Sequence, residues 1–81
     1  LVFSPLMNGF IHGRAELNGM GDITAMLIEA GGYSTNPYPI YHYDVLDHYE
    51  YDLEVPPGSY SLKASLIGYQ DLTIDDVIVF P

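Results

Sequence analysis

The 81-residue sequence contains no cysteine and no tryptophan, and only Arg14 and Lys63 carry a fixed positive charge. Without cysteine there is no disulfide framework and no thiolate metal site, so the core must be stable by itself. Eleven carboxylates give a formal net charge of −9. Nucleic acids and anionic membranes are therefore excluded as partners, because their affinity comes largely from Lys and Arg. No apolar run approaches the roughly 20 residues of a membrane span, so no membrane insertion is expected.

The length fits one small domain, which buries only about 60–65% of its unfolded surface. We therefore predict a single β-sandwich domain over residues 1–81. The sequence begins at Leu1 rather than Met, which suggests a piece of a larger multidomain protein. The neighbouring domains of that protein are its first expected partners.

The clearest pattern lies between Tyr49 and Tyr69, where apolar and polar residues alternate on both sides of Pro56-Pro57-Gly58. Period-two alternation is typical of half-buried strands, and Pro followed by Gly is typical of a type II turn. The sequence therefore predicts an antiparallel hairpin with Val55 opposite Tyr60. The same register sets Asp52 against Lys63 on the outer face, an opposite-charge cross-strand pair.

The remaining segments also favour short strands separated by turns. We expect an edge strand or linker at Leu1 to Met7, a strand at Ile11 to Leu17, and a flexible loop at Asn18 to Asp22. Ile23 to Ala30 has helix-favouring residues, but it is short and bounded by glycine, so a buried strand is predicted.

Two prolines between Tyr33 and Tyr43 restrict that stretch to an edge strand or extended loop. Asp44 to His48 is then interpreted as a polar link. The last strand, Leu72 to Phe80, changes phase at Asp75-Asp76, which predicts a bulge. Six or seven strands without a convincing helix indicate an all-β, antiparallel sandwich.

A family resemblance rests on the order of these segments. The most specific part is Val55-Pro56-Pro57-Gly58-x-Tyr60-x-Leu62, followed by Gly68-Tyr69. This pattern resembles the carboxypeptidase regulatory-like domains, which belong with the transthyretin-like (prealbumin-like) β-sandwiches. The resemblance implies a Greek-key sandwich of about seven strands that is a non-catalytic accessory module of a secreted or cell-surface protein. It implies no particular ligand or cofactor.

The sequence departs from that family at the Tyr- and Pro-rich stretch from Tyr33 to His48, where individual properties of this domain are expected. Exposed tyrosines can stack on sugar rings or pack against a partner chain. The candidate ligand-binding residues are Tyr33, Tyr38, Tyr41 and Tyr43. They permit two functions: a structural spacer or protein-interaction module, and alternatively a carbohydrate-binding module. Without tryptophan a strong carbohydrate platform is disfavoured.

Two groups of residues have the chemistry of metal ligands. The types that suit zinc are His42, Asp44, Asp47 and His48. The adjacent Asp47 and His48 would point to opposite faces of a regular strand, so a polar loop with hydrogen-bonded histidines is the preferred interpretation. The oxygens that could suit calcium are those of Asn18, Asp22, Asp71, Asp75 and Asp76. Their spacing matches no EF-hand loop, and turn or bulge positions explain them as well. No metal or cofactor is predicted.

Catalysis is not expected. Glycoside hydrolysis needs two carboxylates, one of them with a raised pKa in a pocket, and a small sandwich with outward-facing acids offers little room for one. Lys63 could be considered for an isopeptide bond of the kind found in related surface-protein domains. It falls on the outward phase of its strand, so this bond is not expected either.

Overall fold

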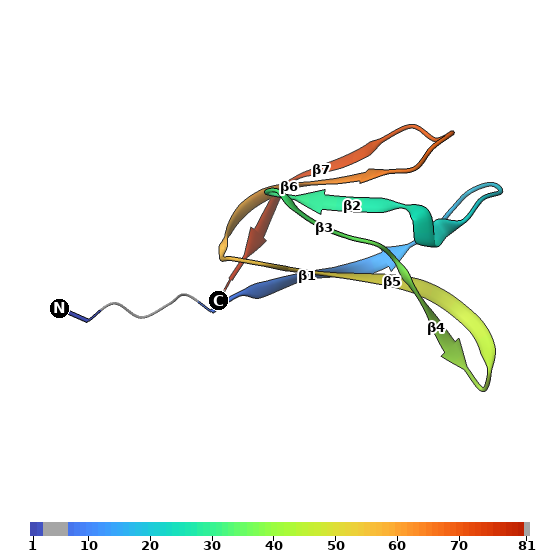
Figure 1. Ribbon diagram of the computed structural model, residues 1–81, viewed down its shortest axis with the longest axis horizontal. Helices are drawn as coiled ribbons and strands as arrows, with labels where there is room; N and C mark the ends of the chain where they lie inside the picture. Colours follow the sequence, from blue (N-terminus) through green and yellow to red (C-terminus); the bar gives the residue numbers. More distant parts are fainter. Residues whose placement is uncertain (3–6, 81) are drawn as a thin grey trace.

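The computed structural model describes residues 1–2 and 7–80, which fold into two antiparallel sheets (Figure 1). The sandwich fold expected from the sequence is confirmed. The strands are β1 (Gly9–Ala15), β2 (Leu27–Ala30), β3 (Tyr33–Thr35), β4 (Tyr38–His42), β5 (Val45–Val55), β6 (Gly58–Ser65) and β7 (Leu72–Val79), with a 3-10 turn η1 (Ile23–Ala25) before β2. No helix in the described part of the chain has the length and apolarity needed to span a membrane.

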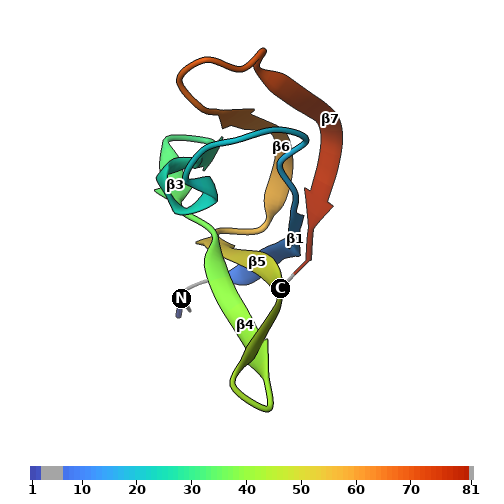
Figure 2. The same ribbon diagram turned by 90° about the vertical axis from the view of Figure 1, so that its right-hand side faces the viewer.

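The three-stranded sheet has the order β1-β5-β4, and the four-stranded sheet has the order β3-β2-β6-β7. The chain crosses from one sheet to the other three times, between β1 and β2, β3 and β4, and β5 and β6 (Figure 2). As a result β5 returns beside β1, and β6 returns beside β2, each after three intervening strands. Such returns are the feature of Greek-key connectivity.

The core lies between the sheets and consists of small and branched side chains. The central buried cluster is Ile11, Ile28, Ala30, Leu53, Val55, Leu62 and Val79. These residues occupy alternate positions of their strands because successive side chains of a strand point to opposite faces. Partly buried side chains, including those of Tyr51 and Tyr60, pack around this cluster.

The prediction of a hairpin across Pro56-Pro57 is wrong. β5 pairs with β1 and β4, whereas β6 pairs with β2 and β7, so the two strands belong to different sheets. Asp52 therefore lies opposite His12, and Lys63 lies opposite Glu29 and Thr73. The alternation correctly predicted which residues face inward, but it does not specify which strand is the partner.

The two prolines explain why the chain crosses instead of turning. The residue before a proline is biased to extended backbone, so Val55 and Pro56 are both kept extended. Three extended residue steps from Val55 to Gly58 cover up to about 10 Å, which is the distance between packed sheets. Gly58 does not have the positive φ that a type II turn needs at this position, so that turn does not form. The Tyr60 hydroxyl donates to the Pro56 carbonyl at 2.5 Å and fixes this corner.

Two other hairpins are closed by two-residue loops. Gly31 and Gly32 join β2 to β3 with φ of 56° and 83°, and Tyr43 and Asp44 join β4 to β5 with φ of 51° and 62°. Two successive positive φ values are typical of the type I′ turn, whose twist matches that of the flanking strands. The polar link expected at Asp44 to His48 is therefore wrong, since β5 begins at Val45 immediately after the turn.

The bulge, the edge strands and the buried strand that the sequence predicts are present in whole or in part. The bulge at Asp75-Asp76 is confirmed, because the β6–β7 register shifts there and Asp76 has a φ of 60°. β3 and β4 are edge strands, as the prolines require. The buried strand expected over Ile23 to Ala30 is correct only from Leu27, because Asp22 caps a 3-10 turn at the start of that segment. The edge strand or linker predicted for Leu1 to Met7 falls mainly on residues 3–6, outside the described residues.

Candidate functional site

The β4–β5 hairpin carries three of the four tyrosines expected to bind a ligand. The turn end of this hairpin projects beyond the rest of the sandwich, as Figures 1 and 2 show. Tyr41 is 62% exposed and Tyr43, in the turn, is 88% exposed. Tyr38 lies at the base of the hairpin, where its hydroxyl donates to Asp52. Tyr33 belongs to β3 in the other sheet, so the structure does not bring all four residues together.

The tip of this hairpin is apolar as well as aromatic. Val45 and Leu46, which follow the turn, are also exposed. The Tyr43 ring makes an edge contact with the His42 ring, with centroids 4.4 Å apart and planes 68° apart. We call Tyr41, Tyr43, Val45 and Leu46 the hairpin tip.

A continuous network of side chains, joined by hydrogen bonds and one ion contact, covers the outer face of the three-stranded sheet. Asp52 accepts from Tyr38 and shares a hydrogen bond with His12 Nδ1. His12 Nε2 lies 3.2 Å from Glu50 Oε1, and the other oxygen of Glu50 is hydrogen-bonded to His48 Nε2. We call this the outer-face network; in order, it consists of Tyr38, Asp52, His12, Glu50, His48 and Asp47.

The last link of the outer-face network depends on a second bulge. The β4–β5 register shifts between Ile40 and Tyr41, whose partners are His48 and Leu46, and leaves Asp47 as the extra residue. His48 Nδ1 lies 2.6 Å from Asp47 Oδ2. The expectation that Asp47 and His48 point to opposite faces is therefore wrong, because it assumed a regular strand.

The outer-face network shifts the acid–base behaviour of its members. The hydrogen bond to Asp52 raises the pKa of His12 above its ordinary 6.5, and the hydrogen bonds to Glu50 and then Asp47 raise the pKa of His48. Arg14 opposes the latter effect through its positive charge. Hydrogen bonds from Tyr38 and His12 lower the pKa of Asp52, and the bond to Asp52 raises the pKa of Tyr38 to about 12. The network can thus hold and release protons, but none of its six members is a Ser, Thr or Cys nucleophile.

These shifts predict a domain that is more stable at mildly acidic pH than at pH 8. Stabilisation from His12 and His48 is complete below the unfolded-state pKa near 6.5 and is lost as the pH rises through their higher folded-state values. Stabilisation from Asp52 is complete above 3.8 and is lost as the pH falls through its lowered value. Protonation of His12 and His48 also brings the formal charge from −9 to −7, which reduces self-repulsion. We expect the melting temperature, followed by circular dichroism, to be highest between these limits and to fall above pH 6.5.

The control is a double variant, His12→Gln with His48→Gln, which keeps a polar side chain at each position but removes the titration. Its melting temperature should depend less on pH between about 5.5 and 8 than that of the unaltered chain. Equal pH profiles for the two proteins would contradict the role assigned to the outer-face network.

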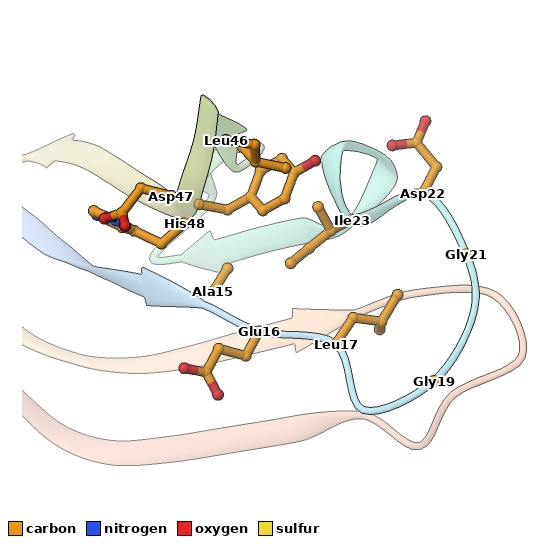
Figure 3. A pocket seen from close by; sticks show the side chains of 11 residues that line it. Ala15, Glu16, Leu17, Gly19, Gly21, Asp22, Ile23, Leu46, Asp47 and His48 are labelled. Carbon is orange, nitrogen blue, oxygen red and sulfur yellow. The ribbon is translucent and has the colours of Figure 1, made fainter. Parts of the chain in front are cut away.

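A groove of about 480 Å³ opens beside the network, between the loop that follows β1 and the start of β5 (Figure 3). Its polar lining comes from Glu16, Asp22, Asp47 and His48. Its apolar wall includes Ile23 and Leu17. The volume lies within the usual range of small-molecule sites, and the three carboxylates favour cationic or hydroxyl-bearing ligands over anions.

The loop that forms one wall of the groove is held in place from the other sheet. The Tyr69 hydroxyl donates to the Met20 carbonyl at 2.6 Å. At the end of the loop, Asp22 Oδ1 accepts from the Thr24 amide at 3.0 Å. A Cβ atom at Gly19, which has a φ of 151°, would lie 2.5 Å from the Tyr69 hydroxyl. The φ of Gly19 disfavours any other residue at this position, and a side chain there would also push the Tyr69 hydroxyl away.

Several of the residues considered as metal ligands have other partners in the structure. His42 and Asp44 lie at the hairpin turn, whereas Asp47 and His48 belong to the outer-face network. Of the aspartates considered for calcium, Asp71 pairs with Lys63 at 3.5 Å and Asp75 accepts from Ser61 at 2.7 Å. Across residues 1–2 and 7–80, no three His, Cys, Asp or Glu side chains are arranged to hold a metal ion.

Sequence reasoning missed the outer-face network because it assigned Asp52 to the wrong partner strand. One signal was present: His48, Glu50 and Asp52 alternate with the inward-facing residues of β5, and His12 occupies the same outward phase in β1. The outward faces could therefore be read from the sequence, but their juxtaposition required the β1–β5 pairing.

Comparison with known proteins finds no family model, no curated protein and no solved structure that matches this chain.

Proposed function

We propose that this domain is a non-catalytic interaction module of a larger secreted or cell-surface protein and that it binds a partner protein through the hairpin tip. The observation that carries the proposal is the exposure of Tyr41, Tyr43, Val45 and Leu46 together at the end of a projecting hairpin. Contiguous exposed apolar residues mark interaction sites. Tyrosine is enriched at such sites because its ring buries a large area at low conformational cost.

The resemblance to the carboxypeptidase regulatory-like domains supports the accessory role. The seven strands and their division into two antiparallel sheets agree with the transthyretin-like sandwich that the resemblance implies. The Pro-Pro-Gly-x-Tyr segment forms the corner between the sheets, with the Tyr60 hydroxyl bound to Pro56. A structural role for this segment at the corner would explain why such a pattern marks a fold rather than an activity.

The high negative charge sets limits on the partners of the domain. With eleven carboxylates and two fixed cations, the surface favours a neutral or basic partner over nucleic acid or an anionic membrane. Neighbouring domains of the parent protein are the first candidates for this partner.

Carbohydrate binding through the same hairpin is the second candidate, because Tyr38, Tyr41 and Tyr43 all belong to it. Sugar platforms use exposed aromatic faces. Here Tyr38 is engaged by Asp52, and Tyr43 meets His42 edge-on. The hairpin therefore favours a protein partner over a flat polysaccharide.

The proposal is tested by selecting peptide ligands for the chain from a random displayed library and mapping them by amide chemical shifts. Ligands of an interaction module should shift the amides from Tyr41 to Leu46. Tyr43→Ser should weaken their binding by about tenfold or more, as expected for a tyrosine anchor. The matched control is Tyr33→Ser, which removes an exposed tyrosine from the other sheet and should leave affinity within about twofold.

Other outcomes would overturn the proposal. Ligands that map elsewhere and tolerate Tyr43→Ser would remove the hairpin tip as the binding surface. Hairpin shifts with cellulose or chitin oligosaccharides but with no peptide would support the carbohydrate-binding alternative. Hydrolytic activity that survives repeated purification would contradict the non-catalytic role.

A further inference from the structure

The sandwich is closed at one end and open at the other along the side where β1 faces β7. At the closed end, Gly9 lies so near the end of β7 that a Cβ atom there would be 2.5 Å from the Phe80 carbonyl oxygen. From this point β7 runs away from β1, as Figure 1 shows. At the open end, Ala15 and Glu16 of the first segment lie across a cleft from Leu72 and Ile74.

The cleft is lined mainly by apolar side chains of the inner faces of both sheets. Its floor includes the buried Ile28 and Leu62, and its walls include Met26, Tyr51, Leu72 and Ile74. Leu72 and Ile74 face inward, since they pair with Ala64 and the buried Leu62. Nevertheless Ile74 is 57% exposed and Leu72 is still more exposed, because β1 does not cover this half of β7.

The dimensions of the cleft suit side chains of a second polypeptide. Its volume of about 150 Å³ is below the roughly 300–1,000 Å³ of sites that enclose a whole small molecule. It continues into a hollow of about 450 Å³ towards the β6–β7 loop, with Glu16, Met26, Ala64 and Leu72 common to both. An extended chain could therefore place one side chain in the cleft and the next inward side chain in the hollow.

The backbone beside the cleft is available for pairing. β7 is the last strand of its sheet, so one side of the strand has no neighbouring strand among those described. The bulge at Asp75-Asp76 interrupts the regular ladder, and such bulges blunt edges against uncontrolled pairing. The regular part of this edge that lies beside the cleft is thus Leu72 to Ile74, whereas Val77 to Val79 lie beyond the bulge, towards the closed end.

Charge identifies the occupant. Asp75 and Asp76 follow the pairing segment, and Asp71, which is already paired with Lys63, precedes it. Glu16 lies on the opposite wall beside Arg14, the one cation among the residues that line the cleft. Two copies of the chain paired through β7 would bring these carboxylates together, on top of a net charge of −9 in each copy. Like charges placed opposite one another destabilise strand pairing. A basic segment would instead have its charge balanced.

We infer that the open edge of β7 and the adjacent cleft form a second binding surface, which accepts an extended peptide segment with alternating apolar and basic residues. The segment adds a strand beside Leu72–Ile74 and inserts apolar side chains against Met26, Tyr51 and Ile74. Strand addition of this kind gains affinity from backbone hydrogen bonds and specificity from side-chain pockets. This surface is separate from the hairpin tip and does not depend on it.

The probe is the synthetic peptide Lys-Val-Lys-Leu-Lys-Val-Lys, titrated into the 81-residue chain with amide and methyl chemical shifts as the readout. We expect the shifts to cluster at Leu72–Ile74 and at the methyl groups of Met26 and Ile74. The same peptide with Glu in place of Lys should not bind, and raising the salt concentration should weaken the basic peptide because exposed charges are screened.

Two matched variants decide where the peptide binds. Ile74→Asp places a charge in the cleft and should weaken binding by about tenfold or more, the effect of losing one buried apolar contact. Ile78→Asp adds the same charge to an outward residue of the same strand that is 61% exposed, and it should leave affinity within about twofold. Since both variants increase the attraction for a basic peptide, a selective loss in Ile74→Asp cannot arise from net charge.

Four results would overturn the inference. One is a spectrum that does not respond to the basic peptide. Another is equal binding by the two variants, which would indicate non-specific attraction to an acidic surface. The third is concentration-dependent self-association in sedimentation experiments that Ile74→Asp abolishes, which would make a second copy the occupant. Loss of binding in Tyr43→Ser would show instead that the peptide uses the hairpin tip.

Discussion

Leu53→Ala is expected to lower the free energy of unfolding by about 2–5 kcal/mol, the usual cost of removing a buried leucine side chain. Leu53 is 3% exposed, belongs to the buried cluster and lies in β5, the central strand of its sheet. A chain of this length has about 4–12 kcal/mol of stability in total. The substitution should therefore leave a large fraction of the protein unfolded at moderate urea concentrations, measured by circular dichroism.

The matched control for this substitution is Leu46→Ala, in the same strand but at the exposed hairpin tip. It should change stability by no more than about 0.5 kcal/mol, as surface substitutions usually do. If the two variants had the same urea midpoint, the buried cluster would not be centred where the structure has it.

Gly9→Ala is expected to cost about 1–3 kcal/mol, the typical penalty for overpacking. A Cβ atom at Gly9 would lie 2.5 Å from the Phe80 carbonyl oxygen and 2.5 Å from Val79 Cγ1. The Val79 side chain has rotamers available, but the backbone oxygen can move only with the end of β7. The closed end of the sandwich must then open, and the urea midpoint should fall.

Gly58→Ala is the control, and it also tests the corner between the sheets. The added Cβ would meet only ordinary contacts with Tyr60, the nearest at 3.6 Å, and Gly58 does not have a positive φ. Alanine should therefore be neutral or slightly stabilising, because it reduces the freedom of the unfolded chain. A loss above about 1 kcal/mol would support the type II turn that the sequence suggested and contradict the crossing.

The sequence predicted the inward-facing residues of the fold better than its strand pairing. Period-two alternation assigns Ile11, Leu53 and Leu62 to the core in any arrangement, because it depends only on the local geometry of a strand. Pairing depends on where the chain goes after each strand. At Pro56-Pro57 two conformations compete, and the extended one matches the spacing between sheets, so the chain crosses there.

The two-residue turns were also only partly predictable from the sequence. Gly31-Gly32 was interpreted only as the end of a strand, although two successive glycines are also a hairpin signal. Tyr43-Asp44 gave no such signal, since tyrosine rarely adopts positive φ. The hairpin that carries the tyrosines was therefore predicted as an edge or loop, and the outer-face network, which needs both β4 and β1 beside β5, could not be derived from the sequence.

The contact between Gly9 and Phe80 also has a consequence for how the domain would be connected to its neighbours in a larger protein. The chain enters the first strand and leaves the last strand at the same end of the sandwich, while the β4–β5 hairpin projects away from that end (Figure 1). Domains joined before and after it would thus be held close together and not separated by its length. Within a larger protein the domain would project to one side of the chain junction, with Tyr41 and Tyr43 at the end of its projecting hairpin.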